Sequence, residues 1–301
     1  MDRLRLSSAA LAVALTGLVA CSGGEPLKPV TVHSEVDESR VAVASPSVAS
    51  PTPTSKDKPE SNKWVTPRPA WLGTRILPLR ADGFGEARPT PPLLRNRRFA
   101  TVDILPRPRK KGFIYTTGPV PDDVLERSTW RPVCPIAVED LSYLTMTFWG
   151  FDHEAHTGEM IVNAQWAEQL AGVFEKLYDA RFEIEEMRVI TLEEQRAWNH
   201  TPTGDTNVTS SFECRRATLN STWSMHSLGL AIDINPFHNP YIRGDLIAPE
   251  LAGAYADRSR VRPGMAVEGS PVVQAFDAIG WGWGGRWTSF KDYMHFSSNG
   301  H

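Results

Sequence analysis

Apolar residues recur with helical spacing in three parts of the chain. The longest such run follows Asn163, which stands in the position of an N-cap. Its apolar members are Trp166, Leu170, Val173, Phe174 and Leu177. A shorter helix is predicted over 272–279 and another over 121–127, where a proline opens the segment and acids fill the first turn.

Other segments have the composition of strands. Residues 143–150 are rich in β-branched and aromatic side chains, and a loop through His153, His156 and Gly158 leads from them to a second predicted strand over 159–162. Further strands are predicted over the segments 186–190, 231–235 and 295–297. Because strands and helices do not alternate regularly, the pattern predicts an α+β fold with a mainly antiparallel sheet.

Composition and charge narrow the class of protein. Of 301 residues, 41% are hydrophobic and 22% are charged, which is typical of a soluble globular protein. The net charge of −3 gives no basic surface for nucleic acid, so a nucleic-acid partner is not expected. Ten tryptophans are many for this length, and several lie near the candidate metal ligands described below.

The first residues have the pattern of an export signal. Arg3 and Arg5 precede an apolar run over 6–19 that is too short for a membrane span. The run ends in Leu18-Val-Ala-Cys21, which resembles a bacterial lipobox. The resemblance implies that Cys21 is lipidated and that the protein is anchored on the outer face of the cytoplasmic membrane. An ordinary signal peptide with an incidental cysteine is the alternative.

Composition also predicts the domain organisation. After a signal peptide over 1–20, residues 21–66 form a spacer rich in Pro, Ser and Thr. Residues 67–116 remain proline-rich but carry scattered large apolar side chains, so a partly structured linker is expected there. The folded domain is predicted over 117–301, and no internal repeat is found.

Two cysteines remain in the exported part of the chain. In an oxidising compartment Cys134 and Cys214 are expected to form a disulfide that closes a long loop. Two buried free thiols are the alternative. Neither cysteine has C-x-x-C spacing, which argues against a cysteine zinc site or a redox motif.

The candidate chemistry lies in two segments, 224–233 and 292–295. The first offers His226 and Asp233, whose spacing of seven fits a turn that leads into a strand. In that strand the larger apolar side chains alternate with Asp233, which places the carboxylate on the opposite face.

The second segment supplies His295 and, one turn before it, Asp292. A catalytic zinc requires three nitrogen or oxygen ligands, an open position and a nearby base. We therefore predict one zinc ion per chain, bound by His226, Asp233 and His295, with Asp292 as the general base.

A guanidinium binds a carboxylate group of a substrate in a bidentate manner. Arg215 is the first candidate and Arg216 is the competitor, while a structural ion pair is the alternative for Arg215. Trp283 and Trp287 are candidates for the walls of a substrate subsite, although core packing around a bend is an equal alternative. Ser224 is expected to support the loop near the substrate by hydrogen bonding rather than to act as a nucleophile.

These motifs resemble a known family. The pattern Ser224-x-His-x-x-Gly-x-Ala-x-Asp233, followed by Gly282-Trp-Gly-Gly-x-Trp287 and Asp292-x-x-His295, is similar to the M15 zinc D-alanyl-D-alanine carboxypeptidases and L-alanyl-D-glutamate endopeptidases, which include the VanY-like enzymes. The resemblance covers roughly residues 117–301. It implies a small antiparallel sheet flanked by helices, as in the Hedgehog signalling domain, and peptidoglycan stem peptides as substrates. Many relatives carry Glu in place of Asp292.

Two functional classes follow. The first is a zinc peptidase that hydrolyses stem peptides outside the membrane, with carboxypeptidase activity favoured over endopeptidase activity. The second is a non-catalytic, peptidoglycan-binding or structural lipoprotein of the same fold, which would have no need of a spare base. Serine peptidase chemistry is rejected, because the Ser-x-x-Lys of 55–58 lies in the spacer without a Lys-Thr-Gly partner. The sequence leaves the oligomeric state open.

Overall fold

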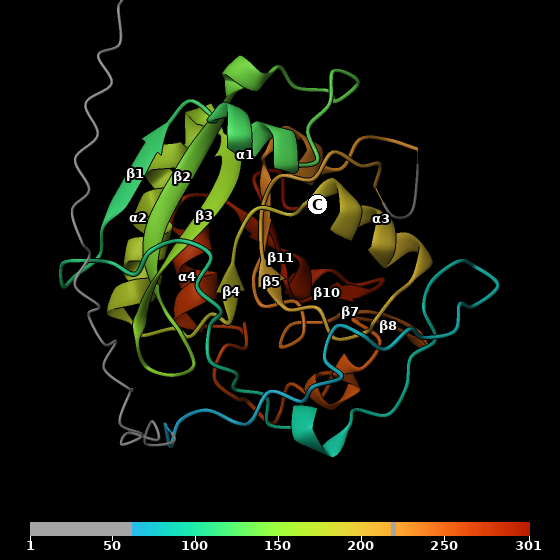
Figure 1. Ribbon diagram of the computed structural model, residues 1–301. Coiled ribbons are helices and arrows are strands. Elements are labelled where there is room, and N and C mark those ends of the chain that lie inside the picture. Colours follow the sequence, from blue (N-terminus) through green and yellow to red (C-terminus); the bar gives the residue numbers. More distant parts are fainter. Residues whose placement is uncertain (1–61, 218–220) are drawn as a thin grey trace, which may run out of the picture. The chain divides into compact units, whose positions relative to one another are not determined.

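The computed structural model describes residues 62–217 and 221–301. Its first sheet has the order β1-β2-β3 and is antiparallel throughout. The strands are β1 (Tyr115–Gly118), β2 (Leu141–Trp149) and β3 (Ala155–Asn163). β2 and β3 form the long hairpin at the left of Figure 1.

The main core lies between this sheet and two helices. Helix α2 (Ala167–Asp179) packs on β2, and α4 (Pro271–Asp277) packs on α2 (Figure 1). Asn163 caps the short 3-10 turn η3 (Ala164–Trp166) in front of α2, where its side chain accepts a hydrogen bond from the Gln165 amide. The helical periodicity of the sequence is confirmed, because the apolar positions of α2 from Leu170 to Leu177 are buried in this core.

Two further antiparallel sheets carry the candidate site. One has the order β6-β11-β9, from β6 (Ala231–Asp233), β11 (His295–Ser297) and β9 (Gly282–Trp283). The other has the order β10-β7-β8, from β10 (Lys291–Asp292), β7 (Tyr241–Arg243) and β8 (Leu246–Ala248). The predicted fold class, α+β with mainly antiparallel pairing, is confirmed, but the strands form several small sheets rather than one.

Some elements differ from the prediction. The predicted strand over 186–190 is reduced to β4 (Glu186–Met187), which pairs in parallel with β5 (Val208–Thr209). His156 and Gly158 lie inside β3 and not in a loop, because the hairpin turn is already complete at Ala155. Helix α3 (Leu192–His200) was not predicted.

The remaining elements are short. Helix α1 (Asp122–Arg127) begins after Pro121, as predicted. The other 3-10 turns are η1 (Pro92–Leu94), η2 (Val138–Asp140), η4 (Met225–Leu228), η5 (Ala252–Tyr255) and η6 (Gly284–Arg286).

Residues 62–114 contribute to a second core. Leu77, Leu94 and Phe99 are buried together with residues of the C-terminal half. The latter are Phe237, Leu251, Ala252, Tyr255 and Met265. This segment is therefore packed chain, which we call the N-terminal strap (residues 62–114). It includes most of the linker predicted over 67–116. The domain boundaries proposed from composition stay a prediction, and the signal peptide and most of the spacer lie outside the described residues.

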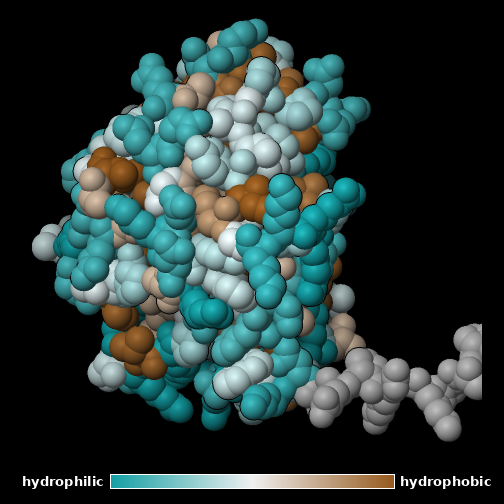
Figure 2. Space-filling view, turned by 90° about the vertical axis from the view of Figure 1, so that its left-hand side faces the viewer, coloured by the Kyte–Doolittle hydropathy of each residue, from teal (hydrophilic) through white to brown (hydrophobic). Residues whose placement is uncertain are grey.

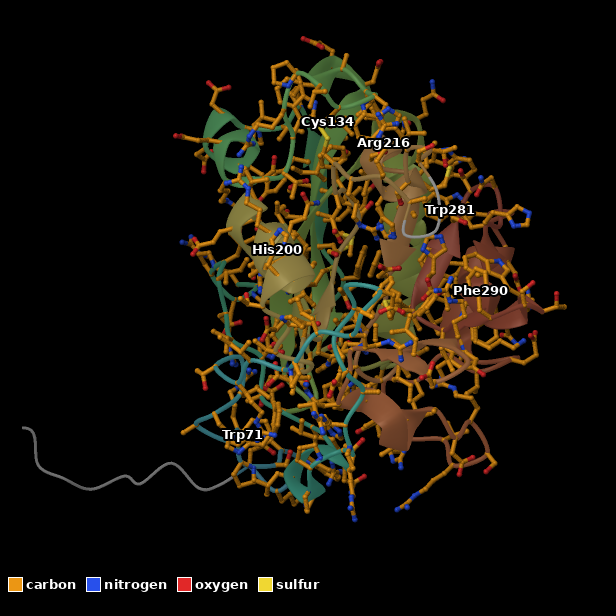
Figure 3. All side chains as sticks on the ribbon, turned by 90° about the vertical axis from the view of Figure 1, so that its right-hand side faces the viewer. Trp71, Cys134, His200, Arg216, Trp281 and Phe290 are labelled. Carbon is orange, nitrogen blue, oxygen red and sulfur yellow. A yellow bond between two sulfur atoms is a disulfide. The ribbon has the colours of Figure 1, made fainter. Side chains whose placement is uncertain are left out.

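A disulfide joins Cys134 and Cys214, and its yellow bond lies at the top of Figure 3 near Arg216. Among the described residues, no helix combines the length and apolar character that crossing a membrane requires. The face that carries β1 and α2 is mostly hydrophilic, and its hydrophobic side chains lie in separate small groups (Figure 2). A mostly hydrophilic face is what the composition of the sequence, typical of a globular protein, leads us to expect.

Candidate metal centre

His226 is held by a tight turn between two capping residues. Ser224 begins η4, and its side-chain oxygen accepts a hydrogen bond of 3.3 Å from the His226 amide. Gly229 ends the turn with φ of +64°, and a Cβ at this position would lie 2.4 Å from the backbone nitrogen of Asn163. Only glycine fits this approach to β3, so the spacing His226-x-x-Gly229 has a steric cause.

Asp233 and His295 are directly opposite partners in the antiparallel pair β6–β11. Side chains of such a pair share one face of the sheet. The next partners, Ile232 and Phe296, are fully buried in the main core on the other face. The strand alternation predicted for 230–235 therefore orients the Asp233 carboxylate away from the core.

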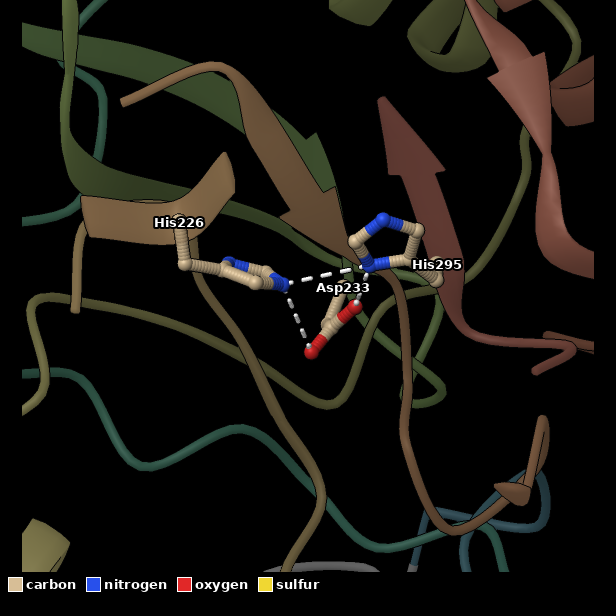
Figure 4. Close-up of side chains that lie close together, drawn as sticks. All are labelled: His226, Asp233 and His295. Atoms are coloured by element: carbon tan, nitrogen blue, oxygen red, sulfur yellow. Dashed lines mark hydrogen bonds and ion pairs between the residues drawn. The ribbon is translucent and has the colours of Figure 1, made fainter. Parts of the chain in front are cut away.

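The three predicted ligands meet at one point (Figure 4). His226 Nε2 lies 3.2 Å from His295 Nδ1 and 3.3 Å from one Asp233 carboxylate oxygen. His295 Nδ1 lies 3.2 Å from the other oxygen of Asp233. Ligand atoms bound at 2.0–2.1 Å in a tetrahedron are about 3.3 Å apart. The spacing of these donors therefore fits a small divalent cation such as zinc.

The outer nitrogens of both imidazoles are bound to carbonyl groups. His226 Nδ1 lies 2.7 Å from the Ser211 carbonyl oxygen, and His295 Nε2 lies 3.4 Å from that of His301. A carbonyl only accepts, so each outer nitrogen carries the proton and each inner nitrogen presents a lone pair. Two lone pairs and a carboxylate that converge in this way are suited to bind a cation.

The charges of the three predicted ligands shift the pKa values of Asp233 and His226. Burial by itself would raise the pKa of Asp233, but His226 and His295 outweigh that effect and hold this pKa well below its usual range. Burial likewise opposes protonation of His226, yet the Asp233 carboxylate raises the pKa of this imidazole. The site thus favours an ionised carboxylate paired with a cationic partner.

Asp292 lies on β10, next to the three donors but not among them. A Cβ on Gly284 would lie 2.5 Å from the Asp292 carbonyl oxygen, so this glycine permits the close approach of β10. Burial, followed by the negative charge of Asp233, raises the pKa of Asp292 to about 7. One of its carboxylate oxygens, Oδ1, is buried without a hydrogen-bond partner. A carboxyl group that gains and loses a proton near neutral pH can act as a general base.

The two arginine candidates differ in position. Arg215 forms an ion pair of 3.2 Å with Glu213, and the charges of Glu213, Asp233 and Asp292 raise its pKa against the effect of burial. Arg216 instead lies 3.9 Å above the ring of Trp223 and donates to the Ser221 carbonyl. The structure thus brings Arg215, and not Arg216, toward the candidate centre.

The two tryptophan candidates also differ in position. Trp283 is 5% exposed, packs on Phe296 in the main core and donates to the Tyr293 carbonyl. Its placement favours the packing alternative. Trp287 is half-buried, and its ring centroid lies 5.4 Å from that of His295, which places it beside the ligands.

Several contributors were not found from the sequence. Glu213, the partner of Arg215, belongs to none of the motifs above, and its charge alone did not distinguish it. The Ser211 and His301 carbonyls are backbone groups, which no residue type reveals. His238 is fully buried away from the three ligands, where it binds Asn207 and the Arg97 carbonyl, and burial lowers its pKa to about 4.

Comparison with known proteins covers part of the chain. Residues 218–298 match the family model of D-alanyl-D-alanine carboxypeptidases in the M15 peptidases. No curated protein and no solved structure matched the chain. The matched segment contains His226, Asp233, Asp292 and His295, and Arg215 precedes it. At the family level, this match supports a peptidase related to the M15 family over the matched segment.

Proposed function

We propose that the protein is a zinc-dependent D-alanyl-D-alanine carboxypeptidase that trims peptidoglycan stem peptides. The observation that carries this proposal is the convergence of His226, Asp233 and His295 at mutual distances of 3.2–3.3 Å, with Asp292 beside them. The carboxypeptidase family model matches this same segment. One zinc ion per chain would be held by the two imidazoles and the Asp233 carboxylate.

Each residue has a distinct role in the proposed reaction. Zinc, when bound, supplies a Lewis acid that polarises the peptide carbonyl and makes water more acidic. Asp292 takes the proton from the attacking water and later delivers it to the nitrogen of the leaving D-alanine. Its raised pKa suits this transfer at neutral pH. Asp233 remains ionised throughout, because the neighbouring imidazoles hold its pKa low.

Recognition of the chain end is assigned to Arg215. Its guanidinium is half-buried beside Asp233 and Asp292, and a bidentate contact with the terminal carboxylate would orient the last peptide bond toward them. Trp287 would cover the adjacent D-alanine, since its ring lies next to His295. These contacts favour carboxypeptidase over endopeptidase activity, because a substrate without a free terminal carboxylate gains nothing from Arg215.

The proposed location is the outer face of the cytoplasmic membrane, with Cys21 as the lipid anchor. The pattern of residues 1–21 supports this proposal. A disulfide between Cys134 and Cys214 suits an oxidising compartment. Metabolic labelling with a fatty-acid analogue, compared between the wild type and a Cys21→Ala variant, tests the anchor.

The activity is tested with a defined stem pentapeptide and a cross-linked stem dimer, each analysed by mass spectrometry. We expect loss of one D-alanine from the pentapeptide, inhibition by a chelator and recovery with zinc. Asp292→Ala is expected to lower kcat by about 10²- to 10⁴-fold while zinc remains bound, because this residue is not a ligand. His226→Ala is expected to lose the metal, and His200→Ala, on the exposed end of α3, serves as the matched histidine control.

The other outcomes assign other functions. Cleavage of the dimer but not of the pentapeptide would replace carboxypeptidase by endopeptidase activity. Binding of stem peptides without chelator-sensitive cleavage would select the non-catalytic wall protein. Full activity of the Asp292→Ala protein would refute the assignment of the base.

A further inference from the structure

Tyr241 lies directly opposite Asp292 in the antiparallel pair β7–β10. Directly opposite side chains share one face of a sheet, with Cβ atoms about 4.5–5.5 Å apart. Tyr241 therefore stands on the same face as the proposed base, on the adjacent strand. No sequence motif pointed to it, because a tyrosine at the start of a short strand has no chemical pattern of its own.

Both members of this pair have a buried oxygen that lacks a hydrogen-bond partner. These atoms are the Tyr241 hydroxyl and Asp292 Oδ1. Nearly all buried polar groups in proteins are hydrogen-bonded, and each exception requires a physical cause. The two exceptions belong to one cross-strand pair, so a donor and an acceptor that no protein group uses stand on the same face of the sheet.

An aromatic wall connects Tyr241 to the candidate metal centre. The ring centroids of Tyr241 and Phe290 are 5.4 Å apart, and those of Phe290 and Trp287 are 5.1 Å apart. Trp287 in turn lies 5.4 Å from the ligand His295. Phe290 is labelled at the right of Figure 3. Tyr241 thus belongs to the same wall as the residues beside the ligands.

The chemistry of the pair indicates which ligand groups it matches. A carboxylate accepts hydrogen bonds, and a phenol donates one. Burial raises the pKa of Tyr241, so the phenol keeps its proton at neutral pH. A donor and an acceptor side by side match the C=O and N–H groups of a peptide.

We propose that Tyr241 is a further substrate-binding residue, whose hydroxyl donates a hydrogen bond to a carbonyl oxygen of the peptide held beside Asp292. This assignment rests on the proposed peptidase function. It makes β7 part of the active site.

The proposal is tested with Tyr241→Phe, which removes the hydroxyl and keeps the ring. A hydroxyl without a protein partner adds nothing to folding, so we expect an unchanged or slightly higher Tm and unchanged zinc content. We expect kcat/KM for the stem pentapeptide to fall by about 10- to 100-fold, since the substrate carbonyl loses its partner. A second readout is the Kd of the pentapeptide for Asp292→Asn protein, which is expected to weaken by a similar factor when Tyr241→Phe is added.

Tyr255→Phe is the matched control. The Tyr255 hydroxyl is buried but accepts a hydrogen bond of 2.9 Å from the Arg97 amide, so its loss is expected to lower Tm and leave kcat/KM unchanged. Wild-type kcat/KM and unchanged peptide affinity in Tyr241→Phe would overturn the proposal, as would a fall in Tm or zinc content that accounts for the lost activity. If wild-type protein cleaves no peptide, the proposed function fails instead, and the Kd measurement still decides whether Tyr241 binds the peptide.

Discussion

Two carboxyl groups in one site, Asp233 and Asp292, have opposite pKa shifts. Two imidazoles adjoin Asp233 and lower its pKa, whereas Asp292 is buried beside another negative charge, which raises its pKa to about 7. The difference arises from neighbours at distances that no sequence spacing encodes. In the proposed reaction, this difference separates a metal ligand from a group that exchanges a proton.

Arg215 and Arg216 provide a prediction at the level of single residues. Arg215→Ala is expected to raise KM for the pentapeptide by about 10-fold or more, because the terminal carboxylate loses a charged hydrogen-bond partner. Arg216→Ala is expected to change KM by less than about 2-fold, since its guanidinium lies on Trp223 at an exposed position. Steady-state kinetics of both variants decide between them, and equal effects would contradict the assignment.

The sequence predicted the metal donors and Asp292, but it left the choice among the other candidate residues open. His226, Asp233 and His295 were identifiable because histidine and aspartate at these intervals are typical of a metal site. The choice between Arg215 and Arg216 required the structure, because adjacent residues point in different directions. Trp283 illustrates the same limit, since a tryptophan between glycines can pack in a core or line a subsite.

At the level of elements, the length of a helix or strand determined whether the sequence predicted it. The periodicity of α2 extends over several turns and was identified, whereas β7, β9 and β10 have two or three residues each and show no pattern. Helix α3 was missed although Thr191 and Glu194 form a capping box at its start. This helix has too few apolar residues to show a helical period in the sequence.

The disulfide is expected to stabilise the segment that carries Arg215. It joins cysteines 80 positions apart, and Cys214 immediately precedes Arg215. Replacing both cysteines by serine is expected to lower the free energy of unfolding by about 2–5 kcal/mol. KM is expected to rise, because Arg215 loses its neighbouring anchor. Urea unfolding and kinetics with and without a reductant measure this, and the double variant should not respond to the reductant.

A buried histidine connects the β2–β3 hairpin to the N-terminal strap. His156 is fully buried, and its ring nitrogens lie 2.7 Å from Asp103 and 3.0 Å from Asp152. Burial would lower the pKa of His156, but the hydrogen bonds to the two carboxylates outweigh it and raise the pKa. The charged bridge is therefore stable below the unfolded-state pKa of about 6.5 and weakens as pH rises through the higher folded value.

We expect His156→Gln to destabilise the protein most at pH 5–6 and progressively less at higher pH. The free energy of unfolding, measured by urea titration at several pH values, tests this. His200→Gln, on the surface of α3, is the control and should show no such trend. A constant difference between wild type and His156→Gln across pH 5–9 would show that the ring acts only through packing.

At the scale of the whole molecule, the N-terminal strap is bound to the rest by a buried ion pair. Arg97 donates to both carboxylate oxygens of Glu185 at 2.8 and 2.7 Å, and both side chains are almost fully buried. Asn207 binds the same carboxylate and also accepts from the Phe237 amide. The linker over 67–116 was predicted to be only partly structured because it is rich in proline. Its buried residues contact partners that are distant in the sequence, and composition does not reveal such contacts.

Glu185→Ala is expected to lower the free energy of unfolding by about 3–5 kcal/mol, since it leaves the Arg97 charge buried and unpaired. The double variant Arg97→Met, Glu185→Leu removes both charges and is expected to recover much of this loss. Denaturant unfolding of the three proteins measures the difference. Additive losses in the double variant would contradict the coupling of the two charges.

In the proposed zinc site, the pairing of Asp233 with His295 would link a bound cation to folding itself. Both ligands belong to the ladder whose reverse face, Ile232 and Phe296, lies in the main core. The unfolded chain does not hold these ligands together and therefore does not bind the ion. Binding of the ion thus stabilises the native state. The melting temperature therefore reports how much of the site is occupied by zinc. It should rise with the free concentration of zinc, even in a variant that has lost all turnover.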